Sequence, residues 1–270
     1  PQPSECKMLR EGQVLFTYLH LAPDPEQARG LMDSSCIAIA YETVTDSKGG
    51  LPLLAPMSEV AGRMSIQVGA AALQANAGGR GVLLGGVPGV RPGKVLIIGG
   101  GVVGIAAATI AHGMRADVSI LDVSLSKLQE IDRLFSGEVK TIASSAYDIE
   151  KELIEADLVV GAVLVHGAKA PKLVTNKLVS KMKPGSVLVD VAIDQGGCFE
   201  DSRATTHAEP TYKVHNSIFY CVANMPGAVP ATSTYALANA TIKYGLAIAN
   251  KGWQTATGED AALAKGVNIH

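Results

Sequence analysis

Short apolar runs alternate with amphipathic stretches through the middle of the chain. The pattern predicts strands at 94–98, 117–121, 139–143, 157–162 and 186–190, separated by helices at 102–114, 124–135, 147–154 and 173–182. Continuous apolar strands that alternate with helices are typical of a parallel sheet covered on both faces. The sequence therefore predicts a doubly wound α/β fold, a Rossmann domain with a parallel sheet, in this part of the chain.

The flanking segments predict a second α/β lobe that is incomplete. Strands are expected from Gln13 to Leu21 and from Cys36 to Tyr41, with a helix near 24–33 between them. A helix from Ser58 to Ala77 and a Gly- and Pro-rich loop at 78–93 then lead to the central strands. A strand at 217–222 and a long helix at 232–251 follow. We expect residues 1–52 and 229–270 to form one domain and 53–228 the other.

The segment after the first central strand predicts a dinucleotide site. The strand runs into Gly-Gly-Gly-Val-Val-Gly, a G-x-G-x-x-G pattern. Gly99 permits a tight turn, Gly101 lets backbone N–H groups approach a diphosphate, and Gly104 lets the helix pack closely. Asp122 ends the next strand, where a carboxylate can bind ribose hydroxyls and repel a 2′-phosphate, which favours NAD over NADP. The alternative is an ordinary glycine turn with Asp122 merely exposed.

Charge, hydropathy and cysteine usage exclude several classes of protein. The net charge is −2 and the basic residues are scattered, so no nucleic-acid partner is expected. The stretch 95–114 is uncharged and long enough for a membrane span, but three glycines interrupt it, and strand, turn and helix explain it better. The four cysteines lack metal-like spacing, so we expect no metal site and reduced thiols in the cytoplasm.

Polar residues at strand ends are the candidates for chemistry, because ligands gather at the carboxyl ends of parallel strands. His20 follows an apolar strand and is a candidate proton shuttle, or else a structural histidine. Asp194 lies just beyond the strand that ends at Asp190; it is the better placed of the two for proton transfer, unless it only caps a turn. Asn224 is a candidate ligand of cofactor or substrate, or a turn residue. Arg203 and Lys127 are candidate phosphate or ribose contacts, or surface charges.

Several motifs resemble one family over nearly the whole chain. They are LFTYLHLA at 15–22, AYETV at 40–44, PLLAPMSEVAGRM at 52–64, GAVLV at 161–165, GAKAPKLV at 167–174, VDVAIDQGG at 189–197 and YCVANMP at 220–226. They are similar to those of the bacterial L-alanine dehydrogenases, in the alanine dehydrogenase and transhydrogenase superfamily.

The resemblance implies a chemistry and a set of site residues. The family oxidises L-alanine reversibly with NAD and water to pyruvate, ammonia and NADH. By motif position, His20 matches the catalytic histidine at the substrate oxygen, and Asp194 the catalytic aspartate beside the nicotinamide. The resemblance implies further cofactor contacts in the same way: Ser58, Val102, Val103, Asp122, Lys127, Ser144, Val163, Leu164, Val191, Arg203, Val222, Asn224 and Met225. Asn224 is also expected to reach the substrate.

The chain also departs from the family pattern. It starts downstream of an arginine and a lysine that bind the substrate in the family, the family continues past His270, and His166 stands where proline is expected. These departures predict a fragment that holds NAD but does not orient alanine. Relatives form hexamers, so a homo-oligomer is expected. Two alternatives remain: the NAD-binding component of a proton-translocating transhydrogenase, and a non-catalytic NAD-binding module.

Overall fold

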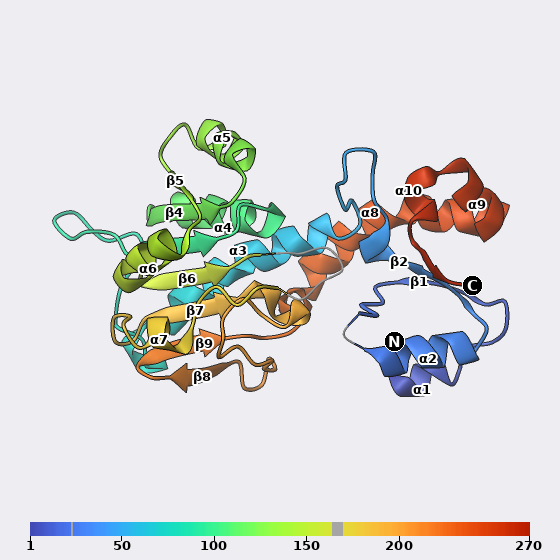
Figure 1. The fold of residues 1–270 in the computed structure, drawn as a ribbon, viewed down its shortest axis with the longest axis horizontal. Coiled ribbons are helices and arrows are strands. Elements are labelled where there is room, and N and C mark those ends of the chain that lie inside the picture. Colours follow the sequence, from blue (N-terminus) through green and yellow to red (C-terminus); the bar gives the residue numbers. More distant parts are fainter. Residues whose placement is uncertain (23, 164–169) are drawn as a thin grey trace. The chain divides into compact units, whose positions relative to one another are not determined.

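The computed structural model describes residues 1–22, 24–163 and 170–270. The chain forms two compact units (Figure 1). The terminal unit comprises Pro1–Met57 and Pro230–His270, and the central unit comprises Ser58–Val229. The division falls one to five residues from the boundaries expected from the sequence, after residues 52 and 228.

The central unit contains a seven-stranded sheet in the order β5-β4-β3-β6-β7-β9-β8. All neighbours are parallel except β8, which is antiparallel to β9 at one edge. Without β8 the order is 3-2-1-4-5-6 along the chain, the order of a doubly wound dinucleotide-binding fold. The strands are β3 (Lys94–Ile98), β4 (Asp117–Asp122), β5 (Lys140–Ala143), β6 (Leu158–Gly161), β7 (Val187–Asp190), β8 (Thr211–Val214) and β9 (Ser217–Tyr220). The predicted fold class is confirmed.

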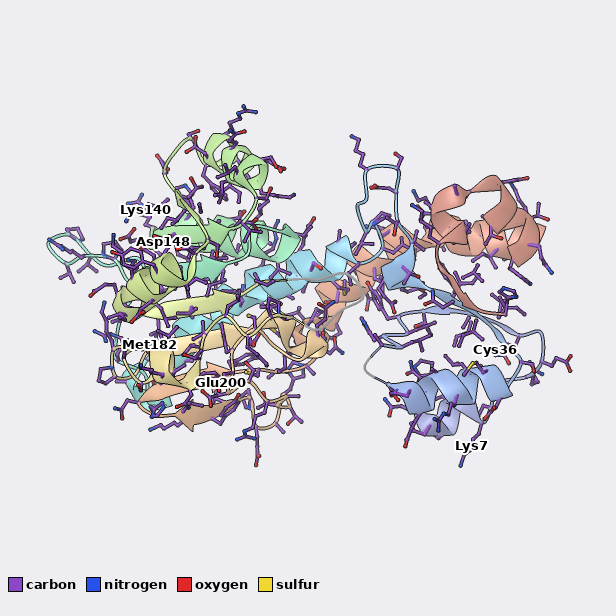
Figure 2. The ribbon with its side chains drawn as sticks, in the orientation of Figure 1. Lys7, Cys36, Lys140, Asp148, Met182 and Glu200 are labelled. Carbon is purple, nitrogen blue, oxygen red and sulfur yellow. The ribbon has the colours of Figure 1, made fainter. Side chains whose placement is uncertain are left out.

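The helices of the central unit begin at the polar residues that usually cap helices. Ser124, Ser145 and Thr175 each accept a hydrogen bond from a backbone N–H in the first turn of α5, α6 and α7. Figure 2 labels Asp148, whose N–H binds the Ser145 cap. The helices are α3 (Ala55–Ala72), α4 (Val102–Gly113), α5 (Leu125–Leu134), α6 (Ala146–Glu155) and α7 (Asn176–Val179), with short 3-10 turns η2 (Ala75–Ala77), η3 (Val191–Gln195) and η4 (Met225–Ala228).

Two helix predictions in this unit were wrong in extent. The helix expected at 173–182 is only α7, because Leu173 and Val174 are drawn into extended pairing beside Cys198 and Phe199. The helix expected to start at Ser58 starts at Ala55, since a proline is tolerated in a first turn. It ends at Ala72, before η2.

Helix α3 packs at close range on the Rossmann sheet and on α4. A Cβ atom on Gly62 would lie 2.3 Å from the carbonyl oxygen of Val103, and one on Gly69 would lie 2.5 Å from a methyl carbon of Leu158. Only glycine permits contacts this short, so α3 is fixed against the start of α4 and against β6.

The apolar stretch 95–114 is strand, turn and helix, as the sequence predicts: β3 and α4 occupy it. Among the described residues, no helix is both long and apolar enough to cross a membrane.

The terminal unit contains a three-stranded sheet in the order β1-β2-β10. Strands β1 (Val14–Thr17) and β2 (Ile37–Ala40) are parallel, and β10 (Val267–Ile269) is antiparallel to β2. The first strand is shorter than the 13–21 expected, because the chain turns at His20, whose φ is 51°. The helices are α1 (Pro3–Cys6), α2 (Pro25–Asp33), α8 (Pro230–Lys251), α9 (Trp253–Glu259) and α10 (Ala261–Ala264), with the 3-10 turn η1 (Tyr41–Thr43).

Candidate active site

The glycine turn between β3 and α4 has the geometry that the sequence predicts. Gly99 has a φ of 109°, and a Cβ there would lie 2.6 Å from the carbonyl oxygen of Ala162. A Cβ on Gly104 would lie 1.9 Å from the carbonyl oxygen of Gly99, so the helix packs directly on the turn. A Cβ on Gly101 would meet nothing within 4 Å. The described residues therefore leave the space above Gly101 open.

The first turn of α4 faces this open space without a capping side chain. Gly101 is the N-cap of a twelve-residue helix and offers no side-chain acceptor to the N–H groups behind it. Such N–H groups, together with the helix dipole, favour an anionic ligand. The turn thus fits a diphosphate.

Asp122 lies at the carboxyl end of β4, beside the same turn. Its Oδ2 accepts a hydrogen bond from the N–H of Gly100 at 2.7 Å, and its Oδ1 accepts one from the N–H of Ser124 at 2.8 Å. Each carboxylate oxygen can accept a further hydrogen bond. The carboxylate can therefore hold the turn and still receive a ribose hydroxyl.

Six of the remaining cofactor contacts expected from the sequence follow parallel strands of one sheet. The ends of these strands lie at the same edge, since the strands are parallel. This set shares that edge with Gly99 and Asp122; it comprises Ser144 after β5, Val163 after β6, Val191 after β7, and Val222, Asn224 and Met225 after β9. Leu164 and His166 lie outside the described residues.

Four expected contacts lie on helices of this unit. Val102 and Val103 open α4, and Ser58 is half-buried in the first turns of α3. Lys127 lies on α5, where its ammonium is 3.6 Å from the Glu130 carboxylate. An exposed pair of this kind is weak and leaves the lysine side chain able to reorient.

Arg203 is held by Tyr212 of β8. The guanidinium carbon lies 4.1 Å from the centre of the Tyr212 ring, and the backbone N–H of Arg203 donates to the Tyr212 hydroxyl at 2.9 Å. The Tyr212 hydroxyl donates in turn to the carbonyl oxygen of Asp201 at 2.8 Å. Both the backbone and the side chain of Arg203 are thus fixed by one tyrosine.

The aspartate that ends β7 and the one on the turn that follows lie in different environments. Asp194 is exposed on η3, whereas Asp190 is fully buried. The Asp190 carboxylate accepts from the N–H groups of Ala192 at 3.1 Å and Cys198 at 2.9 Å, and from the hydroxyl of Ser202. Burial raises the pKa of Asp190, and these donors oppose that shift. Asp190 therefore closes the 190–202 loop, on which Asp194 is carried.

Asn224 occupies a left-handed conformation, with φ 58° and ψ 51°. Its carbonyl oxygen lies 3.1 Å from Nε2 of His207. Its side chain is exposed at the start of η4, at the same edge as the glycine turn.

His20 lies in the terminal unit, three residues after β1. It is exposed and in a left-handed conformation, its ring stacks on that of Tyr18 at a centroid distance of 5.7 Å, and its N–H donates to Glu42. Glu42 follows β2, which is parallel to β1. The three polar side chains therefore share the carboxyl edge of the small sheet.

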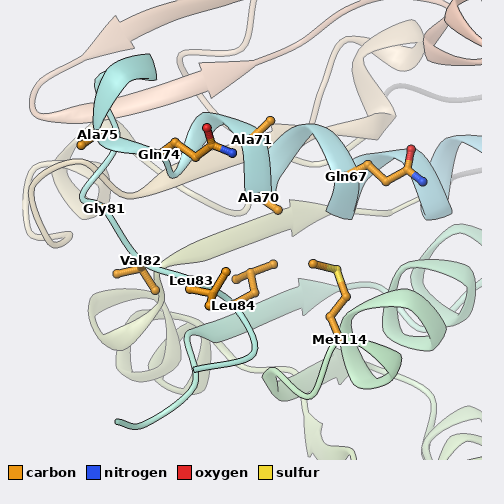
Figure 3. Close-up of a pocket in the computed structure, with 10 residues that line it drawn as sticks. All are labelled: Gln67, Ala70, Ala71, Gln74, Ala75, Gly81, Val82, Leu83, Leu84 and Met114. Carbon is orange, nitrogen blue, oxygen red and sulfur yellow. The ribbon is translucent and has the colours of Figure 1, made fainter. Parts of the chain in front are cut away.

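An open apolar groove of about 610 Å³ lies elsewhere in the central unit (Figure 3). It is lined by α3, by the loop through Leu84 and by Met114. The carbonyl oxygen of Leu84 binds the N–H of Gly93, just before β3, so the groove lies at the amino ends of the strands. None of the expected site residues that the structure describes lines it.

The sequence profiles of known families decide where the chain belongs. The profile of the alanine dehydrogenase/PNT C-terminal domain matches residues 65–270, and that of the alanine dehydrogenase/PNT N-terminal domain matches residues 1–61. The chain belongs to the alanine dehydrogenase/PNT family. The expected resemblance is confirmed.

Comparison with individual members of the alanine dehydrogenase/PNT family supports the same assignment. The chain is 59% identical to an alanine dehydrogenase of Mycolicibacterium smegmatis and 57% identical to one of Halomonas elongata, over all of this chain and 73% of each relative. A solved L-alanine dehydrogenase matches with a TM-score of 0.94 and 51% identity, over all of this chain and 74% of that one. A transhydrogenase from Sinorhizobium meliloti has a TM-score of 0.83 at 22% identity, which shows a shared fold.

Three residues that hold parts of the candidate site in place were not predicted from the sequence. Tyr212 lies on β8, a short edge strand that the apolar pattern did not predict. Asp190 was considered only as a weaker candidate than Asp194 for proton transfer. Its position at the end of a buried strand, before two glycines, was a signal that its side chain binds the loop that follows. Glu42 directly follows a buried strand, as His20 follows the strand beside it, and this parallel placement was the available signal.

Proposed function

We propose that this protein is an NAD-dependent L-alanine dehydrogenase, which converts L-alanine and water reversibly to pyruvate and ammonia. One observation carries the proposal: the chain is 56–59% identical to alanine dehydrogenases along essentially its whole length. The glycine turn and Asp122 supply the dinucleotide site that this reaction requires.

The cofactor is held by groups on the carboxyl edge of the central sheet. The N–H groups at the start of α4 bind the diphosphate, and the open space above Gly101 admits it. Asp122 accepts hydrogen bonds from the ribose hydroxyls. Arg203, fixed by Tyr212, and Lys127 provide positive charge, and the residues after β5, β6, β7 and β9 complete the contacts. Bound NAD supplies the hydride acceptor, C4 of the nicotinamide.

His20 and Asp194 are the proposed proton-transfer groups. Oxidation of the alanine amine gives an imine, and water then replaces ammonia at that carbon. His20 bonds the substrate oxygen and moves a proton there, as an imidazole can near neutral pH. Asp194, exposed at the nicotinamide end of the proposed site, holds or receives a proton as water attacks. Asn224 orients cofactor or substrate.

An assay of L-alanine-dependent NADH formation on the purified protein tests the proposal. We expect turnover with L-alanine in the complete protein, whereas the 270-residue chain alone should bind NADH and turn over little, because it is not expected to orient alanine. In the complete protein Asp194→Asn should lower turnover by about a hundredfold or more, within the usual contribution of proton-transfer groups. His20→Ala should lower turnover without unfolding the protein. Asp132→Asn, an exposed aspartate on α5, is the matched control. NADH binding without turnover in the complete protein would favour the non-catalytic alternative instead.

Assembly and location are part of the same proposal. The resemblance to the alanine dehydrogenases implies a homohexamer, and all four cysteines are free and buried, which suits a reducing cytoplasm. Sedimentation velocity of the purified protein tests the assembly. The transhydrogenase alternative is not proposed, because the likeness to that protein extends to the fold alone.

A further inference from the structure

The backbone at His20 is strained. A φ of 51° places a residue with a side chain in the left-handed region, which costs free energy and persists only where neighbouring groups enforce it. His20 is also exposed, so core packing does not enforce this conformation. Other contacts must hold it.

Glu42 supplies those contacts through its carboxylate. Oε1 accepts the N–H of His20 at 2.6 Å and the N–H of Leu19 at 3.1 Å, and Oε2 lies 3.2 Å from the same Leu19 nitrogen. Two successive N–H groups thus converge on one anion. Hydrogen bonds to a charged acceptor are about twice as strong as neutral ones, and a half-buried carboxylate is less screened than an exposed one.

The peptide before His20 is fixed from the other side as well. Leu19 is buried, and its carbonyl oxygen accepts a hydrogen bond from the side-chain amide of Gln27 on α2. The N–H groups of Leu19 and His20 therefore bind Glu42, while the carbonyl group of Leu19 binds Gln27 on α2. Rotation of this segment would break both sets of hydrogen bonds.

The imidazole itself lies on a rigid platform. The rings of Tyr18 and His20 are stacked at 5.7 Å with an interplanar angle of 12°. The Tyr18 hydroxyl donates to the carbonyl oxygen of Leu53 at 2.6 Å, and the edge of Tyr41 packs on the Tyr18 ring at 5.0 Å. The ring direction of His20 therefore follows from its backbone conformation and from this platform.

We propose that Glu42 is a positioning residue for His20: its carboxylate holds the left-handed turn at Leu19 and His20, so that the imidazole is presented from the Tyr18 platform. Glu42 acts through backbone N–H groups and carries no proton in the reaction. The inference deepens the proposed function, because it rests on the catalytic role of His20.

A double-mutant cycle tests this inference. Glu42→Ala should lower kcat about tenfold to a hundredfold, because small displacements of a reacting group have effects of that size, while the dissociation constant of NADH stays within about twofold. Glu42→Gln keeps a neutral acceptor and should restore part of the rate. In a His20→Ala background, Glu42→Ala should change kcat by less than about twofold, because residues that act as one unit are not additive. Glu26→Ala, an exposed glutamate on α2, is the matched control.

The imidazole resonances of His20 give a readout that needs no turnover. In the unmodified protein the ring current of Tyr18 should shift them, and Glu42→Ala should move them toward the values of a free histidine. Equal losses of kcat from Glu42→Ala with and without His20 would overturn the inference and leave the proposed function standing. Wild-type turnover in His20→Ala would overturn the catalytic role of His20 and with it this inference, while the dehydrogenase activity itself would stand.

Discussion

The carboxylate of Asp122 accepts a hydrogen bond from the backbone N–H of Gly100 at 2.7 Å. The residue expected to recognise the ribose thus also anchors the turn expected to bind the diphosphate. Its second oxygen is bound to the N–H of Ser124, at the cap of α5. One side chain therefore sets the relative positions of two cofactor subsites and the helix that follows.

Replacing Asp122 by serine should affect both cofactor choice and stability. We expect the ratio of NADPH to NADH affinity to rise by about tenfold or more, since a repulsive charge and a ribose hydrogen bond of about 1–3 kcal/mol are removed. NADH itself should bind less tightly because the turn loses its anchor. Fluorescence titration with both cofactors measures the effect. Equal affinities in the unmodified protein would contradict the assignment.

Two glycines in the same turn should respond differently to alanine. A Cβ on Gly104 meets the Gly99 oxygen at 1.9 Å, so Gly104→Ala should lower the free energy of unfolding by about 1–3 kcal/mol, the usual cost of overpacking. Gly101→Ala places its methyl in open space at an ordinary φ of −76° and should leave stability nearly unchanged. It should weaken NADH binding, because the methyl occupies the diphosphate position. Denaturant unfolding measures the loss of stability in Gly104→Ala, and NADH titration measures the loss of binding in Gly101→Ala. An unaltered NADH affinity in Gly101→Ala would mean that the diphosphate binds elsewhere.

Asp190→Asn should destabilise the central unit. Backbone and side-chain donors converge on the carboxylate, and an amide group would turn its own N–H toward some of them, leaving buried groups unpaired at a cost of about 1–3 kcal/mol. Ser202→Ala removes only one of these donors and should cost less. Chemical denaturation compares the two variants. A more stable Asp190→Asn protein would mean that desolvation of the carboxylate outweighs its hydrogen bonds.

Alkaline pH should weaken the fold through buried tyrosines. Burial raises the pKa of Tyr18, Tyr41, Tyr212 and Tyr220 above the usual value of about 10. Above about pH 10 the unfolded chain loses phenolic protons that the folded chain retains, so the free energy of unfolding falls as pH rises.

Denaturant titrations at a series of alkaline pH values measure this slope. Tyr18→Phe should make the slope shallower, because one of the four phenols is gone. A free energy of unfolding that is independent of pH between about 9 and 11 would contradict the prediction.

Most of the central sheet could be predicted from the sequence because β3, β4, β6, β7 and β9 are buried on both faces. Their apolar runs are continuous, and serine or threonine marks the start of each following helix except α4, which follows the glycine turn. Strand β8 was not predicted, because it lies at the sheet edge and its residues, Thr-Tyr-Lys-Val, alternate between exposed and half-buried positions. The helix at 173–182 was wrong because tertiary pairing of Leu173 and Val174 overrides helix propensity.

The site was predictable to the level of strand ends and no further. Position after a strand placed Asp122, Asp194 and Asn224 at one edge. Asp190 is buried and Asp194 is exposed because hydrogen-bond donors from residues as far along the chain as Ser202 converge on Asp190. The sequence pattern does not show that convergence. The left-handed conformation of His20 is likewise set by Glu42, a residue distant in sequence. The catalytic roles of His20 and Asp194 remain predictions.

The antiparallel pairing of β10 with β2 has a consequence for how the chain folds. Val267 pairs with Ile39, and the whole central unit lies between them in sequence. During synthesis the ribosome releases residues 58–229 before the last strand of the small sheet exists. Because contacts between distant segments form slowly, we expect the Rossmann unit to fold first, while the edge of β2 that β10 later covers is still open. An unpaired strand edge of this kind is a site at which a nascent chain can aggregate.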